Sequence, residues 1–209
     1  MRIVKEHEER KNEIIQAAAA LFAEKGYEQC SVNDILHAVG IAKGTFYHYF
    51  KSKEDVLDAA VGKMSEEVFK LVQEAAKKKE LSPVDRMIQV LLAARVTNRT
   101  GEVLIDEMHK TGNVLLHQKT LVSIITMLTP VFTEIVNEGN DSGAFHCAYP
   151  EQSTQILLSA ALTLLDDGIF QTEKEQAAKL FEALISAMEK ILGVNDGTFF
   201  TKMTAYWKF

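Results

Sequence analysis

The stretch SVNDILHAVGIAKGTFYHYFKSK, residues 31–53, decides the fold of the N-terminal part of this chain. Ser31 and Asp34 have the spacing of a capping box, in which the hydroxyl and the carboxylate each accept a backbone N–H at a helix start. Apolar residues then recur at the spacing of one helix face, and Gly40 follows as a residue that readily ends a helix. The sequence therefore predicts a short helix, a glycine turn and a second short helix.

The second short helix has two different faces. With about 100° of turn per residue, Phe46, Tyr49 and Phe50 fall on one side, where they can pack. The other side carries hydroxyl, imidazole and ammonium groups, which can donate hydrogen bonds to phosphates and base edges, and a glycine that permits close approach. The pattern therefore predicts a DNA-contacting face made of Gly44, Thr45, Tyr47, His48 and Lys51.

A further helix is expected to begin at about residue 53. Ser52 and Asp55 repeat the capping-box spacing, and Lys51 and Lys53 flank a helix N-terminus that can itself bind phosphate. We place the domain boundary here, with a helix-turn-helix domain over residues 1–52 and a ligand-binding and dimerisation domain over residues 53–209.

The runs IIQAAAALFAEKGYEQCSVNDIL, residues 14–36, and GIAKGTFYHYFKSKEDVL, residues 40–57, resemble the DNA-binding domain of TetR/AcrR-type repressors. The resemblance covers roughly residues 10–60. This family often has serine or threonine where the chain has Ala42, so the second short helix lacks a side-chain N-cap and one phosphate contact. By position, the resemblance implies that the residues facing DNA are Ser31, Lys43, Gly44, Thr45, Tyr47, His48 and Lys53.

The charge distribution is compatible with a nucleic-acid partner. The net charge of the 209 residues is −6, but residues 1–53 carry +1 and residues 54–209 carry −7. An acidic body is screened over a Debye length of about 8 Å, so basic residues near the turn still attract phosphate. No apolar run reaches the roughly 18 residues of a membrane helix, and the start lacks the apolar segment of a signal peptide. We expect a cytoplasmic protein with no membrane partner.

Helical periodicity continues to the C-terminus and predicts an all-α chain of about nine helices. The first three form the helix-turn-helix head, and the others form the ligand-binding and dimerisation body. One body helix, over about residues 113–137, contains Pro130, where we expect a kink that opens space between helices. Methionine adapts to varied apolar guests. We therefore expect a ligand site lined by Met64, Met87, Leu91, Met108, Met127 and Phe132.

Two apolar helices, over about residues 151–170 and 172–193, are candidates for a homodimer interface of four-helix-bundle type. A capping box at Thr172 and Glu175 predicts where the second begins. A terminal hairpin that completes a monomer core is an open alternative, which the helix-turn-helix disfavours because two heads read two half-sites. The predicted interface residues are Leu158, Leu162, Leu165, Leu180, Phe181, Leu184 and Met188.

The function predicted from these features is a ligand-responsive transcriptional repressor. A homodimer would bind a palindromic double-stranded DNA operator, and a small-molecule effector in the C-terminal domain would release it. A module whose basic head binds an acidic protein partner is the alternative. We expect no enzyme activity, cofactor or metal, because a helical di-metal enzyme needs Glu-x-x-His pairs and the sequence contains none.

Overall fold

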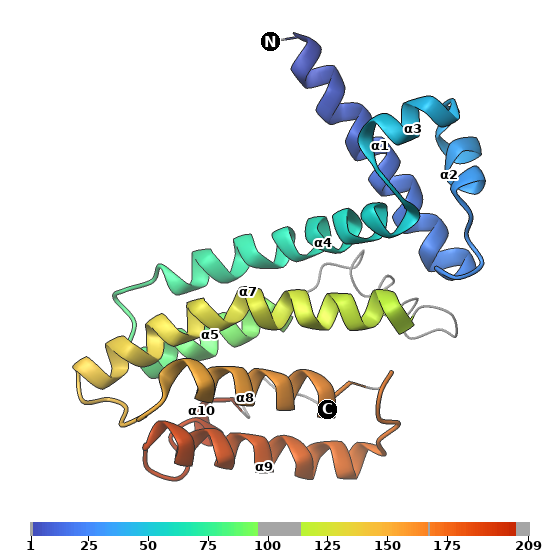
Figure 1. Cartoon of the computed structure of the whole chain (residues 1–209). Helices are drawn as coiled ribbons and strands as arrows, with labels where there is room; N and C mark the ends of the chain where they lie inside the picture. The colour runs from blue at the N-terminus through green and yellow to red at the C-terminus, as the bar shows by residue number, and fades with distance from the viewer. Residues whose placement is uncertain (1, 96–113, 167, 204–209) are drawn as a thin grey trace. The chain divides into compact units, whose positions relative to one another are not determined.

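Helices account for all the regular secondary structure in the part of the chain that the structure describes. The structure is a computed structural model, and it describes residues 2–95, 114–166 and 168–203. The predicted all-α fold is confirmed in these residues. The helices in Figure 1 are α1 (Arg2–Lys25), α2 (Val32–Val39), α3 (Lys43–Tyr49), α4 (Lys53–Ala76), α5 (Pro83–Arg95), α7 (Val114–Asp141), α8 (Pro150–Leu164), α9 (Lys174–Leu192) and α10 (Phe200–Met203).

The described residues form two compact units. The first unit contains residues 2–66 and 114–123, and the second contains residues 67–95, 124–166 and 168–203. The long helices α4 and α7 each supply residues to both units. The domain boundary between residues 52 and 53 stays a prediction.

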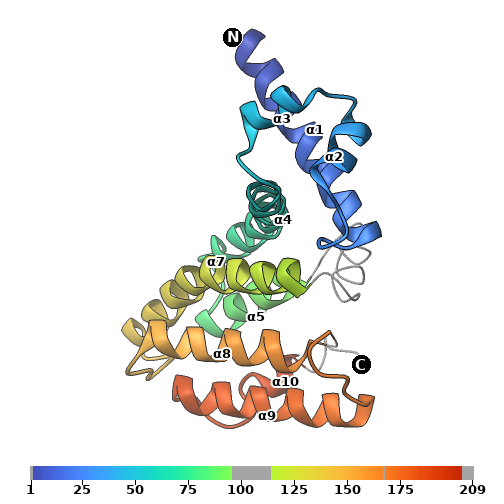
Figure 2. The same ribbon diagram turned by 45° about the vertical axis from the view of Figure 1, so that its right-hand side comes forward.

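Large apolar side chains from three helices make the core of the first unit. Phe22 of α1, Ile35 of α2 and Phe46 of α3 are each 0% exposed. Figure 2 shows α2 and α3 lying beside α1, which supports both. Leu116 of α7 is buried in the same core, so segments far apart in the sequence stabilise it together.

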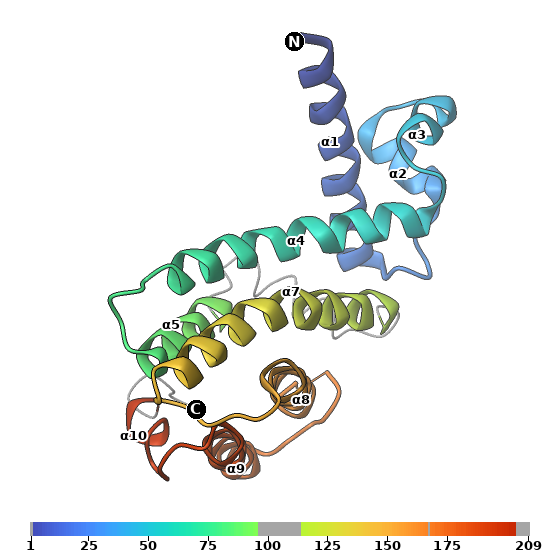
Figure 3. The same ribbon diagram turned by 60° about the vertical axis from the view of Figure 1, so that its left-hand side comes forward.

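The second unit is built from the end of α4, α5, most of α7 and the helices α8 to α10. Figure 3 looks nearly along α8 and α9, which lie side by side. Val90 of α5, Ile135 of α7 and Leu192 of α9 are among the buried residues of one apolar core. The unit therefore has its own hydrophobic core, separate from that of the first unit.

Helix α7 is apolar for a structural reason. By length and composition alone it could cross a bilayer, whereas we expected no apolar run of that length from the sequence. Phe132, Ile135 and Val136 are buried in the core of the second unit, while Glu134 and Glu138 form ion pairs with side chains outside the helix. This pattern is that of a core helix with one polar edge. The helix continues through Pro130 to Asp141.

The segment after α7 packs closely against α7 and the end of α9. A Cβ atom on Gly139 would lie 2.1 Å from the ring of Phe145, so only glycine leaves room for this buried ring. The Asn140 amide group exchanges two hydrogen bonds of 2.9 Å with the backbone of Cys147. The backbone N–H of His146 donates to the carbonyl of Leu192 at 2.7 Å.

The predicted N-cap of α9 is wrong by one residue. Glu173 is the N-cap and its side chain makes no cap hydrogen bond, so the capping box expected at Thr172 is absent. The hydroxyl of Thr172 instead donates to the carbonyl of Phe170 at 3.3 Å. The helix ends at Gly193, as predicted, where a φ of +66° places this glycine in the left-handed region.

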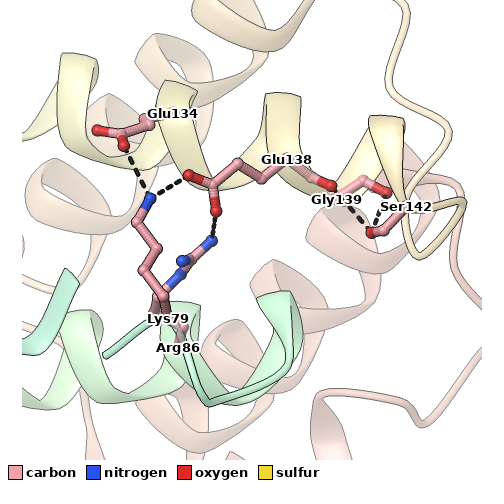
Figure 4. Close-up of polar contacts among 6 residues, drawn as sticks. All are labelled: Lys79, Arg86, Glu134, Glu138, Gly139 and Ser142. Carbon is pink, nitrogen blue, oxygen red and sulfur yellow. Dashed lines mark hydrogen bonds and ion pairs between the residues drawn. The ribbon is translucent and has the colours of Figure 1, made fainter. Parts of the chain in front are cut away.

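A cluster of charged side chains joins α5 and α7 within the second unit (Figure 4). The guanidinium of Arg86, a residue only 2% exposed, donates to the Glu138 carboxylate. Lys79 donates to the same carboxylate and, at 2.9 Å, to Glu134. Lys79 first, and Arg86 after it, hold the pKa of the Glu138 carboxyl below its usual range. Glu138 therefore compensates the charge of a guanidinium that is buried in the protein.

We predict that Glu138→Ala lowers the free energy of unfolding by about 1–3 kcal/mol, because it leaves the buried guanidinium unpaired. Glu134→Ala is the matched control on the same helix. It removes an exposed ion pair, so its cost should stay below about 1 kcal/mol. Urea denaturation of both variants and the wild type measures this difference, and equal costs would contradict the assignment.

The lowered pKa of Glu138 also sets a pH dependence. A carboxylate whose pKa is lowered by folding stabilises the fold above the unfolded pKa of about 4.3, and this contribution is lost as the pH falls through the folded value. The stability difference between the wild type and Glu138→Ala should therefore shrink below about pH 4. If the stability difference between the wild type and Glu138→Ala grows as the pH falls, the assigned role of the Glu138 carboxylate is contradicted.

Candidate functional site

The turn between α2 and α3 has the local geometry that the sequence predicts. The Ser31 hydroxyl accepts the backbone N–H of Asp34 at 3.2 Å, and the Asp34 carboxylate accepts the backbone N–H of Ser31 at 2.8 Å. Gly40 has a φ of +71°, and its N–H donates to the carbonyl of Leu36 at 2.9 Å. Both the predicted capping box and the glycine turn are confirmed.

Helix α3 has the two predicted faces. Phe46 and Phe50 are 0% and 2% exposed, and Tyr49 is partly buried beside them. On the other face, Tyr47 is 49% exposed, and no atom lies within 4 Å of where a Cβ of Gly44 would be. Lys43, His48 and Lys51 are exposed as well, and Thr45 is partly buried. Ala42 gives α3 no side-chain cap, as the sequence predicts.

Lys53 does not share this exposed face. Its ammonium donates to the carbonyls of Tyr27 and Cys30 at 2.8 and 2.9 Å, and it lies 4.1 Å from the centre of the Tyr27 ring. The DNA contact predicted at Lys53 stays a prediction, and in the structure its charge holds the turn between α1 and α2. Ser52, the residue before it, accepts the backbone N–H of Asp55 at 3.1 Å, which caps α4.

The charged groups at the start of α2 are Asp34 and Lys25. Hydrogen bonds from Ser31, and then from Lys25, hold the pKa of the Asp34 carboxyl well below its usual range. The ammonium of Lys25 lies 3.0 Å from that carboxylate, which in turn raises the pKa of Lys25. Burial raises the pKa of the neighbouring Cys30 thiol, so this cysteine is a packing residue. The negative charge of Asp34 is thus compensated locally, next to Ser31.

His7 is a residue of the exposed face that the sequence reasoning missed. Its ring lies 4.6 Å from that of Tyr49 and 5.6 Å from that of His48, measured between ring centres. One signal was available in the sequence. His7 stands two turns before Ile14, a core residue, and so lies on the helix face that points toward α3.

The second unit contains an apolar cavity of about 100 Å³. Three of the predicted ligand-contacting residues line it, namely Met87, Leu91 and Phe132. Met127 packs against the core without lining the cavity. Met108 and the side chain of Met64 lie outside what the structure describes. The structure thus brings together part of the predicted set.

The same cavity involves the predicted dimer interface, which stays a prediction. Most of the residues assigned to that interface turn toward the interior of their own unit, where they line the cavity: Leu158, Leu165, Phe181, Leu184 and Met188. Leu162 and Leu180 are partly buried. The outward face of the same helices is different, since Ile156 of α8 is 60% exposed and Ala183 and Ala187 of α9 are exposed.

Two family models match this chain. The model for bacterial regulatory proteins of the tetR family matches residues 14–60, which contain α2 and α3. The model for the tetracyclin repressor-like C-terminal domain matches residues 95–188. The two matches together cover more than half of the chain.

Individual proteins show the same relationship. The HTH-type transcriptional repressor KstR2 of Mycolicibacterium smegmatis is 30% identical over 46% of this chain and 47% of its own length. The chain spans about half or less of the length of the first curated relatives it matches.

Two solved structures share the fold. A TetR-family transcriptional regulator from Syntrophomonas wolfei is 21% identical, with a TM-score of 0.68 over 90% of this chain and 100% of that chain. RolR in complex with the ligand resorcinol is 18% identical, with a TM-score of 0.61 over 92% and 91% of the two chains. Together with the family matches, they show that this chain belongs to the TetR family of bacterial transcriptional regulators, which are not enzymes.

Proposed function

We propose that this regulator is a repressor that binds a palindromic operator as a homodimer in the cytoplasm and leaves it when a small molecule binds the second unit. The observation that carries the proposal is the exposed face of α3, which presents Lys43, Gly44, Tyr47 and His48 above a buried aromatic anchor. KstR2 is a repressor and RolR binds resorcinol, which supports repression and effector binding here by analogy.

The α3 face suits the major groove. Gly44 lets the helix backbone approach the DNA, Tyr47 and His48 can donate to base edges, and Lys43 can pair with a phosphate. Lys43 Nζ lies 5.9 Å from the centre of the Tyr47 ring, so the cation and the phenol are presented together. His7 extends this face toward α1. Ser31 and Lys51, exposed on either side of α3, complete the proposed contact surface.

The proposed homodimer uses the outward face of α8 and α9. Ile156 supplies exposed apolar area, and Ala183 and Ala187 are one helical turn apart, so a partner helix can approach closely. Two copies related by a two-fold axis would place two α3 helices on half-sites about 34 Å apart, one turn of DNA. A monomeric head would bind a half-site only.

We predict that Tyr47→Ala weakens operator binding at least about tenfold, the effect of losing a contact worth about 1.4 kcal/mol. Tyr149→Ala is the matched control, since Tyr149 is a 71% exposed tyrosine of the second unit. Fluorescence anisotropy with the operator measures binding. The free energy of unfolding of both variants should lie within about 0.5 kcal/mol of the wild-type value.

Undiminished DNA binding by Tyr47→Ala would show that the exposed face of α3 does not contact DNA. Binding to an acidic protein in place of DNA would favour the interaction-module alternative.

We predict that Ile156→Glu converts the dimer to a monomer at micromolar concentration, because a charge at a subunit interface loses its hydration without gaining a partner. Leu71→Glu is the control, because Leu71 is an exposed apolar residue of α4, 42% exposed. Sedimentation equilibrium gives the mass of each variant. A wild type with the mass of one chain, or dissociation by Leu71→Glu alone, would contradict the proposed interface.

A further inference from the structure

The cavity of the second unit is almost entirely apolar. Apart from Thr154, the side chains that line it are those of methionine, leucine, isoleucine, valine, phenylalanine and alanine. The Thr154 hydroxyl donates to the carbonyl of Pro150 at 2.8 Å, so its proton is already used. Among the described residues, the buried side-chain atoms without a hydrogen-bond partner are Arg86 Nε and Thr133 Oγ1, and neither residue lines the cavity.

This lining selects against charge. A carboxylate or an ammonium that entered the cavity would lose its hydration, and no side chain of the lining could pair with it. An amide or hydroxyl would find only the Thr154 oxygen as a hydrogen-bond acceptor among the lining side chains, so it would lose most of its hydrogen bonds with water. An uncharged hydrocarbon has no such cost, and it gains from removing its own surface from water.

The cavity is closed on one side by a fixed part of the chain. Met203 of α10 lines it, and the start of α10 is held by Glu189, a buried residue of α9. The Glu189 carboxylate accepts the backbone N–H groups of Gly197 at 2.8 Å and Phe199 at 2.7 Å. Lys202 pairs with Asp85 at the start of α5. The wall that Met203 contributes is therefore fixed from two helices.

The volume of the cavity limits the size of the molecule that it can bind. An apolar cavity of about 150 Å³ accommodates benzene, and this one has about 100 Å³. Three of its lining residues, Met87, Met188 and Met203, have unbranched side chains that can repack to enlarge it. The cavity thus fits one small ring or a short alkyl group without moving a helix.

We propose that this cavity binds a small, uncharged, apolar molecule of about the size of a monocyclic hydrocarbon. The inference rests on the proposed function where it takes this molecule as the effector, and it names the chemical class of that effector. The binding itself needs no DNA, so it is tested apart from repression.

Toluene and benzoate are matched probes, because they share a ring and differ in charge. We expect toluene to raise the melting temperature of the full chain and benzoate at the same concentration to leave it unchanged. With ¹³C-labelled methionine methyl groups, toluene should shift the NMR signals of Met87, Met188 and Met203. Met127 packs against the same core outside the cavity and should not respond. Equal stabilisation by benzoate, or shifts confined to Met127, would overturn the proposal.

A filling variant provides an independent check. Ala161 lines the cavity, whereas Ala160, the preceding residue of α8, does not. We expect Ala161→Leu to weaken toluene binding at least tenfold and Ala160→Leu to leave it within twofold. Toluene binding that survives Ala161→Leu would contradict the proposal, and the wild-type probes decide it if this variant fails to fold. Toluene that binds without releasing the operator would support the cavity assignment and contradict effector release.

Discussion

The burial of Phe46 is the constraint on which the DNA-facing part of the structure depends. Helix α3 has seven residues and no side-chain cap, and helices shorter than about 12 residues are marginal in isolation. Burying one phenylalanine contributes about 1.5–3 kcal/mol, and Phe50 adds a second buried ring. These anchors fix the rotation of α3 about its axis, and that rotation determines which side chains lie on the face that we propose contacts DNA. Lys53 holds the turn between α1 and α2 by two hydrogen bonds. Polar contacts therefore stabilise the first unit together with its apolar core.

The sequence predicts the head well because its signals are local. The capping box at Ser31, the turn at Gly40 and the two faces of α3 depend on residues within one or two helical turns of each other. Lys53 could not be assigned in this way, because the carbonyls that bind it belong to residues 23 and 26 positions away. The capping box at Thr172 fails because its hydroxyl donates to the carbonyl of Phe170, and the helix begins one residue later than the box predicts.

The body was harder to predict because α8 is apolar on nearly every side, so periodicity cannot say which face meets the core. In the structure, Leu158 and Leu165 line the cavity, whereas Ile156 is exposed to solvent. In our proposal, the effector and the partner subunit therefore contact opposite faces of the same two helices. In the same proposal, a ligand that repacks Phe181 or Met188 would shift helices at the subunit interface, and a coupling of about 1–3 kcal/mol would suffice for a switch.

Selection of bound duplexes from a random DNA pool tests the central claim most directly, because it works without a known operator sequence. If two copies of α3 read DNA, the enriched sequences should form an inverted repeat with half-site centres about one helical turn apart, or a multiple of it. Enrichment of a single unrepeated half-site would contradict the dimeric arrangement. No sequence enrichment at all would contradict DNA reading by α3.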